Sequence, residues 1–109
     1  MNRHVLADER SRVFHTQIAK KLRVEPQLWS IPEHNLQRWK KRMGSLPLSL
    51  YEWDRIFHTY SKEDILEILE SNSEEAQRLR SSSPFTGILT SEERDHILRT
   101  FERKVSTQP

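Results

Sequence analysis

The sequence contains no cysteine, so it can form neither a disulfide framework nor a thiolate metal site. It has only two glycines, and its apolar runs are far shorter than the roughly 20 residues of a membrane-spanning helix. Residues 1–12 carry several charged side chains and no apolar stretch, so they do not resemble a signal peptide. We therefore expect a cytoplasmic protein that does not contact a membrane.

The short motifs of common catalytic and cofactor sites are also missing. The chain has no HExxH, CxxC, GxSxG, Walker or GxGxxG pattern. Its five histidines are scattered, and His15 has no second histidine or carboxylate at metal-ligand spacing on its predicted helix. The sequence therefore predicts a protein that is not an enzyme and that uses no metal or other cofactor.

The chain is instead rich in charge and in helical periodicity. Charged residues make up 31% of its 109 residues and hydrophobic residues only 34%. This length predicts one domain. The low apolar content is typical of a helical domain that has large solvated faces, or of one that completes its core against a partner.

Charge is unevenly distributed along the chain. Residues 1–42 contain ten Lys or Arg and four Asp or Glu, whereas residues 43–75 contain two and eight. A basic first layer and an acidic middle layer can attract each other within the fold. Alternatively, the two signs form a surface that steers a charged partner.

Apolar residues recur at helical spacing along most of the chain, and no segment predicts a strand. The fold we predict is an all-α, compact bundle of about five to six short helices. It forms a single helical domain over residues 1–105, followed by a disordered tail over residues 106–109. The first helix begins near Ala7 or Ser11 and ends near Arg23. After a short turn from Pro26 to Ile31, Pro32 either kinks or breaks the second helix, which Gly44 ends.

Four later helix starts have recognisable capping residues. Ser49 with Glu52 and Thr90 with Glu93 match the capping-box pattern, in which the cap and the third helical residue bond to each other's backbone. Single N-caps are predicted at two other serines, Ser61 and Ser73.

The second helix carries four basic residues around Trp39: Arg38, Lys40, Lys41 and Arg42. Basic residues interleaved with an aromatic side chain are typical of nucleic-acid-binding surfaces. The alternative is that Trp39 belongs to the core and the cations form a solvated face near a helix C-terminus.

The least periodic stretch, from Leu79 to Arg94, is the candidate partner-binding site. Pro84 favours an extended backbone at Ser83, and Gly87 suggests a positive φ. We expect Phe85 between them to plug the core. We also expect the turn to bring two arginines together as a fork for a carboxylate or phosphate. The predicted contact residues are Arg80, Ser83, Pro84, Phe85, Gly87 and Arg94. A nucleotide-binding protein or small enzyme that uses the two arginines is a further hypothesis.

Several short patterns resemble a group of small bacterial antitoxin-like proteins from toxin–antitoxin pairs, over about residues 13–98. They are Phe14-His15-x-x-Ile18-Ala19-Lys20-Lys21-Leu22 with Pro26, Asn35-Leu36-x-Arg38-Trp39, Glu52-Trp53, Leu79-Arg80-x-x-Ser83-Pro84-Phe85-x-Gly87-x-Leu89, and Glu93-Arg94. The Ser-Pro-Phe-x-Gly segment is the most specific of these.

The resemblance implies a protein that binds and neutralises a partner toxin, such as a nuclease or a nucleotidyltransferase. Some members of the group follow an excisionase-like helix-turn-helix. We expect no such DNA-binding module before residue 13 in this chain, and Pro32 falls where the pattern has an uninterrupted helix. A nucleic-acid-binding helical regulator therefore stays the alternative to the protein-binding module.

Overall fold

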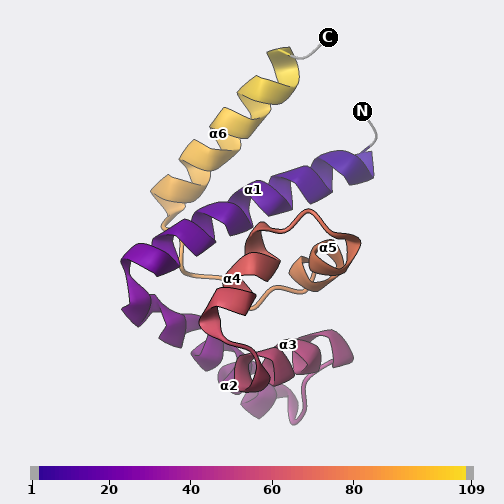
Figure 1. Ribbon diagram of the computed structural model, residues 1–109, viewed down its shortest axis with the longest axis vertical. Helices are drawn as coiled ribbons and strands as arrows, with labels where there is room; N and C mark the ends of the chain where they lie inside the picture. The colour runs from indigo at the N-terminus through magenta and orange to yellow at the C-terminus, as the bar shows by residue number, and fades with distance from the viewer. Residues whose placement is uncertain (1–2, 108–109) are drawn as a thin grey trace.

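The computed structural model describes residues 3–107, which form six α-helices and one 3₁₀ turn and contain no strand (Figure 1). The predicted all-α bundle is therefore confirmed. The elements in chain order are α1 (Arg3–Val24), η1 (Pro26–Trp29), α2 (Ser30–Met43), α3 (Leu48–Thr59), α4 (Lys62–Glu70), α5 (Glu74–Arg80) and α6 (Ser91–Thr107).

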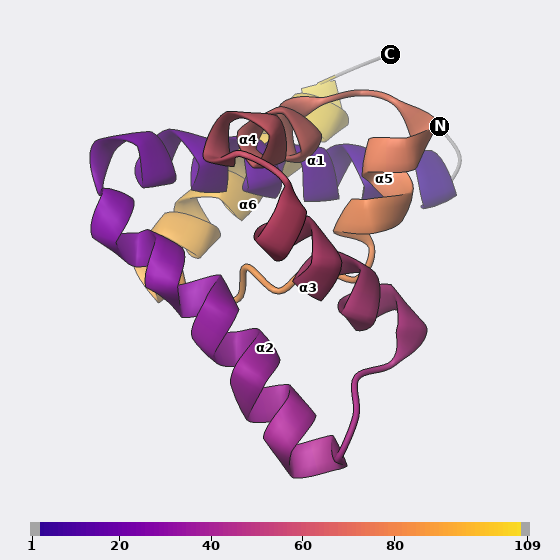
Figure 2. The ribbon, with the colours of Figure 1, turned by 60° about the horizontal axis from the view of Figure 1, so that its bottom comes forward.

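The long helix α1 lies across the molecule and contacts α4, α5 and α6. Helices α2 and α3 pack on each other at the opposite end from α6 (Figure 1). The end of α2 reaches away from the rest of the bundle before the chain returns into α3 (Figure 2). None of the helices in residues 3–107 combines the length and the apolar content that a membrane crossing requires.

Local capping explains where three of the helices begin. The hydroxyl of Ser61 accepts a hydrogen bond from the backbone N–H of Asp64 at 3.1 Å, and Ser73 caps α5 in the same way. Before α6, the N–H of Thr90 donates to Oε1 of Glu93 at 2.8 Å, and the N–H of Glu93 donates to the Thr90 hydroxyl at 3.1 Å. The predicted capping box at this site is confirmed.

The capping box predicted at Ser49 is wrong. Helix α3 begins at Leu48, one residue before the expected cap, and no side chain caps it. The carbonyl oxygen of Pro47 instead accepts from the N–H groups of Leu50 and Tyr51. The fixed φ of proline places Pro47 at the N-cap, so Ser49 lies inside the first turn.

Pro32 neither kinks nor breaks a helix. It is the third residue of α2, which begins at Ser30, within the predicted turn from Pro26 to Ile31. An N–H at this position would have no partner within the helix, so proline costs little there. Gly44 follows the last residue of α2 with a φ of 79°, which confirms the predicted end.

The two ends of the described chain also differ from the prediction. α1 begins at Arg3, before either of the two predicted starts, and ends at Val24. The tail predicted to be disordered is helical at Ser106 and Thr107, while residues 108 and 109 lie outside the described residues.

The core is centred on a group of aromatic rings. Phe85 contacts Trp53 and Phe57, with ring centroids 5.4 and 5.7 Å apart, and Phe57 in turn lies 6.5 Å from Trp29. Such edge and tilted contacts add to the free energy gained from burial. Aliphatic side chains of α1, α4 and α5 surround the rings, among them Leu22, Ile65, Leu69 and Leu79.

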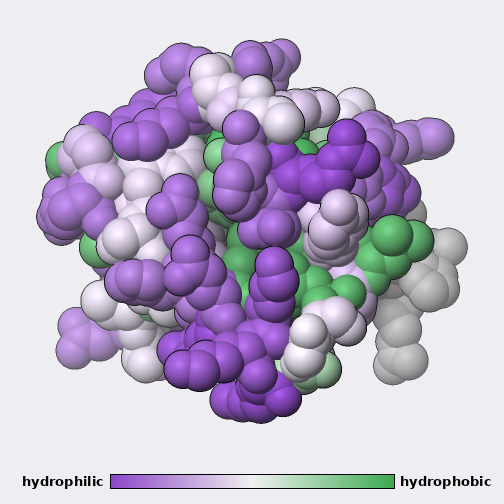
Figure 3. All heavy atoms as spheres, turned by 90° about the horizontal axis from the view of Figure 1, so that it is seen from below, coloured by the Kyte–Doolittle hydropathy of each residue, from purple (hydrophilic) through white to green (hydrophobic). Residues whose placement is uncertain are grey.

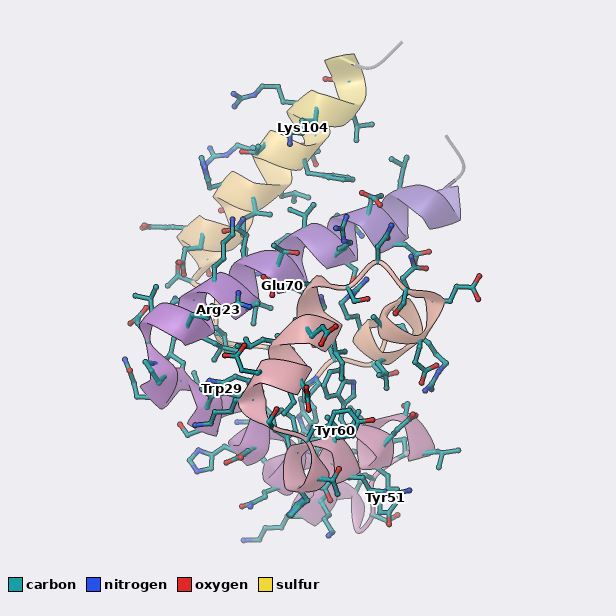
Figure 4. The ribbon with its side chains drawn as sticks, viewed as in Figure 1. Arg23, Trp29, Tyr51, Tyr60, Glu70 and Lys104 are labelled. Carbon is teal, nitrogen blue, oxygen red and sulfur yellow. The ribbon has the colours of Figure 1, made fainter. Side chains whose placement is uncertain are left out.

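Ion pairs link the helices at the surface of this core. Arg23 of α1 and Glu70 at the end of α4 point toward each other (Figure 4), and their closest N···O distance is 2.6 Å. Lys21 of α1 pairs with Glu93 of α6 at the same distance. Arg23 of the basic first helix therefore pairs with Glu70 of the acidic middle segment, which agrees with the predicted attraction between these two layers.

Candidate functional site

The predicted contact loop is mostly a structural element. Pro84 and Phe85 are buried, and the side-chain amide of Asn35 donates hydrogen bonds to the carbonyl oxygens of Pro84 and Thr86 at 2.9 and 2.8 Å. Gly87 has a φ of 97°, as predicted, and is exposed. The expectation that Phe85 plugs the core is confirmed. Its ring is not available to a partner in this conformation.

The predicted arginine fork is wrong because Arg80 is buried, with 3% of its surface exposed. Its Nη1 donates to the carbonyl oxygens of Ile68 and Ser71, at 2.8 and 2.7 Å, where α4 ends. The last carbonyl groups of a helix have no donor within the helix and carry a partial negative charge, so a cationic donor at this end is favourable. Burial lowers the pKa of Arg80, and its Nε and Nη2 have no hydrogen-bond partner among the described residues. Arg80 is therefore a structural clamp.

Arg94 lies elsewhere, on the first turns of α6. Its guanidinium carbon is 5.3 Å from the centroid of the Phe14 ring, a cation–π contact that links α6 to α1. Arg94 is exposed, so it stays available for a ligand or partner.

His15 joins α1 to the loop through both ring nitrogens. Nδ1 lies 2.7 Å from the carbonyl oxygen of Ser11, which can only accept, so Nδ1 carries the proton. The hydroxyl of Ser83 then donates to Nε2 at 2.8 Å. Burial, assisted by the nearby charge of Arg80, lowers the pKa of His15. The imidazole is therefore neutral at pH 7 and serves as a hydrogen-bond link.

The four basic residues predicted as a nucleic-acid surface are all exposed on α2: Arg38, Lys40, Lys41 and Arg42. The two lysines and Arg42 have no carboxylate partner in the part of the chain that the structure describes, while Nη2 of Arg38 donates to Oδ1 of Asn35 at 2.9 Å. Trp39 is partly buried against the core, as the alternative expected. On the face made by α2 and α3, hydrophobic side chains gather at the centre and hydrophilic ones surround them (Figure 3).

A second candidate site is a groove between α3, α4 and α5, with a volume of about 470 Å³. We call it the acidic groove. Ile56, Ile68, Ala76 and Leu79 give it an apolar floor. Its carboxylates outnumber its single arginine, Arg55, and are contributed by Glu52, Asp64, Glu67 and Glu75. Tyr60, which is half exposed, lies at one end where α3 leads into α4 (Figure 4).

Negative charge continues from the groove across the outer face of α4. A second hollow along this helix shares Asp64, Glu67 and Ser71 with the groove and is also lined by Glu63, Glu70 and Arg23. The guanidinium of Arg23 lowers the pKa of Glu70, and Arg78 lowers the pKa of Glu52 and of Glu75. Asp64 and Glu67 have no such ion pair among residues 3–107. The charge that is free to attract a partner is therefore concentrated on α4.

The sequence indicated an acidic segment but did not show which of its carboxylates form the groove. The net charge of −6 over residues 43–75 favoured either an internal layer or a partner surface. Glu70 serves the first role, since it pairs with Arg23, while Asp64 and Glu67 face the groove. Only the fold shows which carboxylates pair within the chain and which face the groove.

Within residues 3–107, no group of three or more histidine, aspartate or glutamate side chains is arranged to hold a metal ion. No family model matches the chain, and comparison with curated proteins and with solved structures gives no match either.

Proposed function

We propose that this chain is a non-catalytic, cytoplasmic protein-binding module that acts as an antitoxin and neutralises a partner toxin. The observation that carries the proposal is the acidic groove, because it combines an apolar floor with a rim of carboxylates. Protein interfaces commonly have an apolar centre and a charged rim that orients the partner. The resemblance of the Ser83-Pro84-Phe85-x-Gly87 segment to antitoxin-like proteins supports the same function.

The occupant that we propose for the acidic groove is a cationic surface of the toxin. A nuclease or a nucleotidyltransferase binds phosphate groups, so its substrate site is lined with Lys or Arg. Asp64 and Glu67 on α4 would attract that surface, and the apolar floor would bury its aliphatic or aromatic side chains. Occupying the substrate surface would neutralise the toxin without any chemistry in the antitoxin.

In this proposal the loop from Leu79 to Arg94 has a supporting role. Arg80, Pro84 and Phe85 hold the bundle together from the inside. Gly87 and Arg94 are exposed, so they stay predicted contact residues. Ser83 is half-buried and bonds to His15, which makes it a link within the fold.

The test is co-expression with the product of the neighbouring open reading frame, followed by co-purification and a growth assay. Replacing Asp64 and Glu67 by lysine should abolish the complex and restore toxicity, because both side chains are exposed at the groove. The matched control is Glu102→Lys, an exposed carboxylate on α6 outside the groove. Circular dichroism should confirm that both variants stay helical.

Two results would contradict the proposal. The first is a neighbouring product that is neither toxic nor bound by this chain. The second is a complex that tolerates the double charge reversal as well as it tolerates Glu102→Lys.

The alternative is a nucleic-acid-binding regulator that uses α2. The observation in its favour is that the end of α2 reaches out of the bundle and carries exposed basic residues (Figure 2). Such binding should weaken steeply as salt is raised and should fall when Lys40, Lys41 and Arg42 are changed to glutamine. Absence of binding to duplex DNA or RNA at low salt would remove this alternative.

A further inference from the structure

A third hollow lies between α1, α6 and the loop that precedes α6, and has a volume of about 450 Å³. We call it the α1–α6 cleft. It is separate from the acidic groove, since the two share no lining residue. Its polar lining comes from Arg10, Ser11 and His15 of α1, from Ser83 and Thr86 of the loop, and from Arg94 of α6.

The two arginines of the cleft differ from three other cations of α1, which have partners within the fold. Arg12 and Lys21 on α1 donate to backbone carbonyl groups, Lys21 also pairs with Glu93, and Arg23 pairs with Glu70. Arg10 and Arg94 have no ion pair within the described part of the chain, and no aspartate or glutamate of that part lines the cleft. The cleft therefore holds two uncompensated positive charges.

Arg94 is already oriented for a ligand. The Phe14 ring lies against its guanidinium group, with 5.3 Å between the guanidinium carbon and the ring centroid. This contact restricts the side chain but uses none of its five N–H donors. A planar fork held in this way loses little conformational entropy when it bonds to the oxygens of a phosphate.

The remaining walls suit the uncharged part of such a ligand. Phe14, Ile18 and Leu98 contribute apolar surface, and Thr86, which also lines the cleft, is exposed. His15 and Ser83 bond to each other at 2.8 Å, so they form a fixed wall and do not compete for the anion. Charge, donors and apolar surface thus meet in one cleft.

We infer that the α1–α6 cleft binds a small phosphate monoester, whose phosphate lies between Arg10 and Arg94 and whose organic group packs on the apolar wall. This site shares no lining residue with the acidic groove, although Arg94 also stays a predicted partner contact. Because α6 makes its main helix contacts with α1, a ligand bonded to both arginines would hold these two helices together. Binding should therefore protect the amides of α6 from hydrogen exchange.

The experiment is calorimetric titration of the full chain with inorganic phosphate, phenyl phosphate and adenosine monophosphate at low salt, with hydrogen exchange as a second measurement. We expect both monoesters to bind more tightly than inorganic phosphate. Arg10→Gln and Arg94→Gln should each weaken binding by about tenfold or more, the loss typical of a charge-assisted hydrogen bond. Arg99→Gln, an exposed position of α6 outside the cleft, should bind like the unchanged chain.

Each outcome bears on the inference. Tight binding of phenyl phosphate alone supports the site and excludes a nucleotide, whereas tight binding of adenosine monophosphate supports a nucleotide ligand. Equal affinity for inorganic phosphate and for both monoesters would show that the organic group does not pack on the apolar wall, and would overturn that part of the inference. No heat at millimolar ligand, an equal loss in Arg99→Gln, or binding without protection of α6 overturns the site as described.

Discussion

The indole Nε1 of Trp53 donates a hydrogen bond of 2.8 Å to the backbone carbonyl of Leu79, and both groups are buried. This bond fixes the largest core side chain of α3 to the end of α5, just before the chain turns into the loop. It places the Trp53 ring against Phe85, so the loop and the two helices share one contact point.

Trp53→Phe should therefore lower the free energy of unfolding by more than the lost packing alone would, because it also removes the indole hydrogen bond. The buried carbonyl of Leu79 would keep its hydrogen bond from the N–H of Ser82 at 3.2 Å but would lose the bond from the indole, which costs about 0.5–1.5 kcal/mol. Urea denaturation measures the change in the free energy of unfolding. Trp39→Phe is the matched control, since Trp39 is only partly buried and its indole has no hydrogen bond among the described residues. Equal losses in the two variants would contradict the role of the Leu79 bond.

Phe85→Ala should cost about 3–5 kcal/mol, as is typical when a buried aromatic ring is removed. The ring is 2% exposed and contacts Trp53 and Phe57. Phe85→Leu should restore part of the loss because it fills most of the space. Thermal unfolding of the three chains gives the order. A free energy of unfolding that is unchanged in the alanine variant would mean that Phe85 does not support the core in solution.

Arg80→Met should also destabilise the chain, by about 2 kcal/mol or more, because hydrogen bonds from a charged donor are worth more than neutral ones. Methionine keeps the aliphatic packing of Arg80 but leaves the carbonyl groups of Ile68 and Ser71 without their donor. Arg99→Met, at an exposed position of α6, should change the stability by less than about 0.5 kcal/mol. Chemical denaturation distinguishes the two. If Arg80→Met stays as stable as Arg99→Met, the clamp at the end of α4 contributes nothing.

Stability should fall as the pH drops below 6.5, the ordinary pKa of histidine. Burial and the charge of Arg80 lower the pKa of His15 in the folded chain, so the unfolded chain takes up a proton first. The unfolded state is then favoured progressively until the pH reaches the lowered pKa of the folded state. Carboxylates such as Glu70 and Glu93, whose pKa values are lowered by Arg23 and Lys21, should add their own loss only below about pH 4.5.

The variant that isolates the histidine contribution is His15→Gln. It should flatten the stability profile just below pH 6.5, and His96→Gln on the exposed side of α6 is the matched control. Denaturation midpoints at closely spaced pH values provide the measurement. A slope that persists in His15→Gln would assign the titration to another group.

Much of the fold could be predicted because its signals are local. Ser61, Ser73 and the Thr90 and Glu93 pair cap helices through bonds to residues three positions away, so their sequence spacing suffices. Gly44 ends α2 for the same reason, since a positive φ is a property of one residue. The N-cap predicted at Ser49 is wrong because a second local signal, Pro47, takes the N-cap position of α3.

The candidate site could not be predicted in this way because it depends on contacts between distant residues. Arg80 has the residue type of an exposed anion-binding group, yet the ends of α4 and α5 enclose it. Glu70 and Glu67 both lie in the acidic segment, but Arg23 lies opposite only one of them. Charge counts along the chain give the sign of a surface, whereas the packing of the helices decides which charges remain free.

The aromatic cluster also has a consequence for biosynthesis. Its rings come from η1, from α3 and from the loop after α5, so no early portion of the chain contains them all. A nascent chain cannot close its core until Phe85 has left the ribosome, when five of the six helices have already been made. We therefore expect the growing chain to remain open and accessible to chaperones for most of its synthesis, and to fold in a single late step.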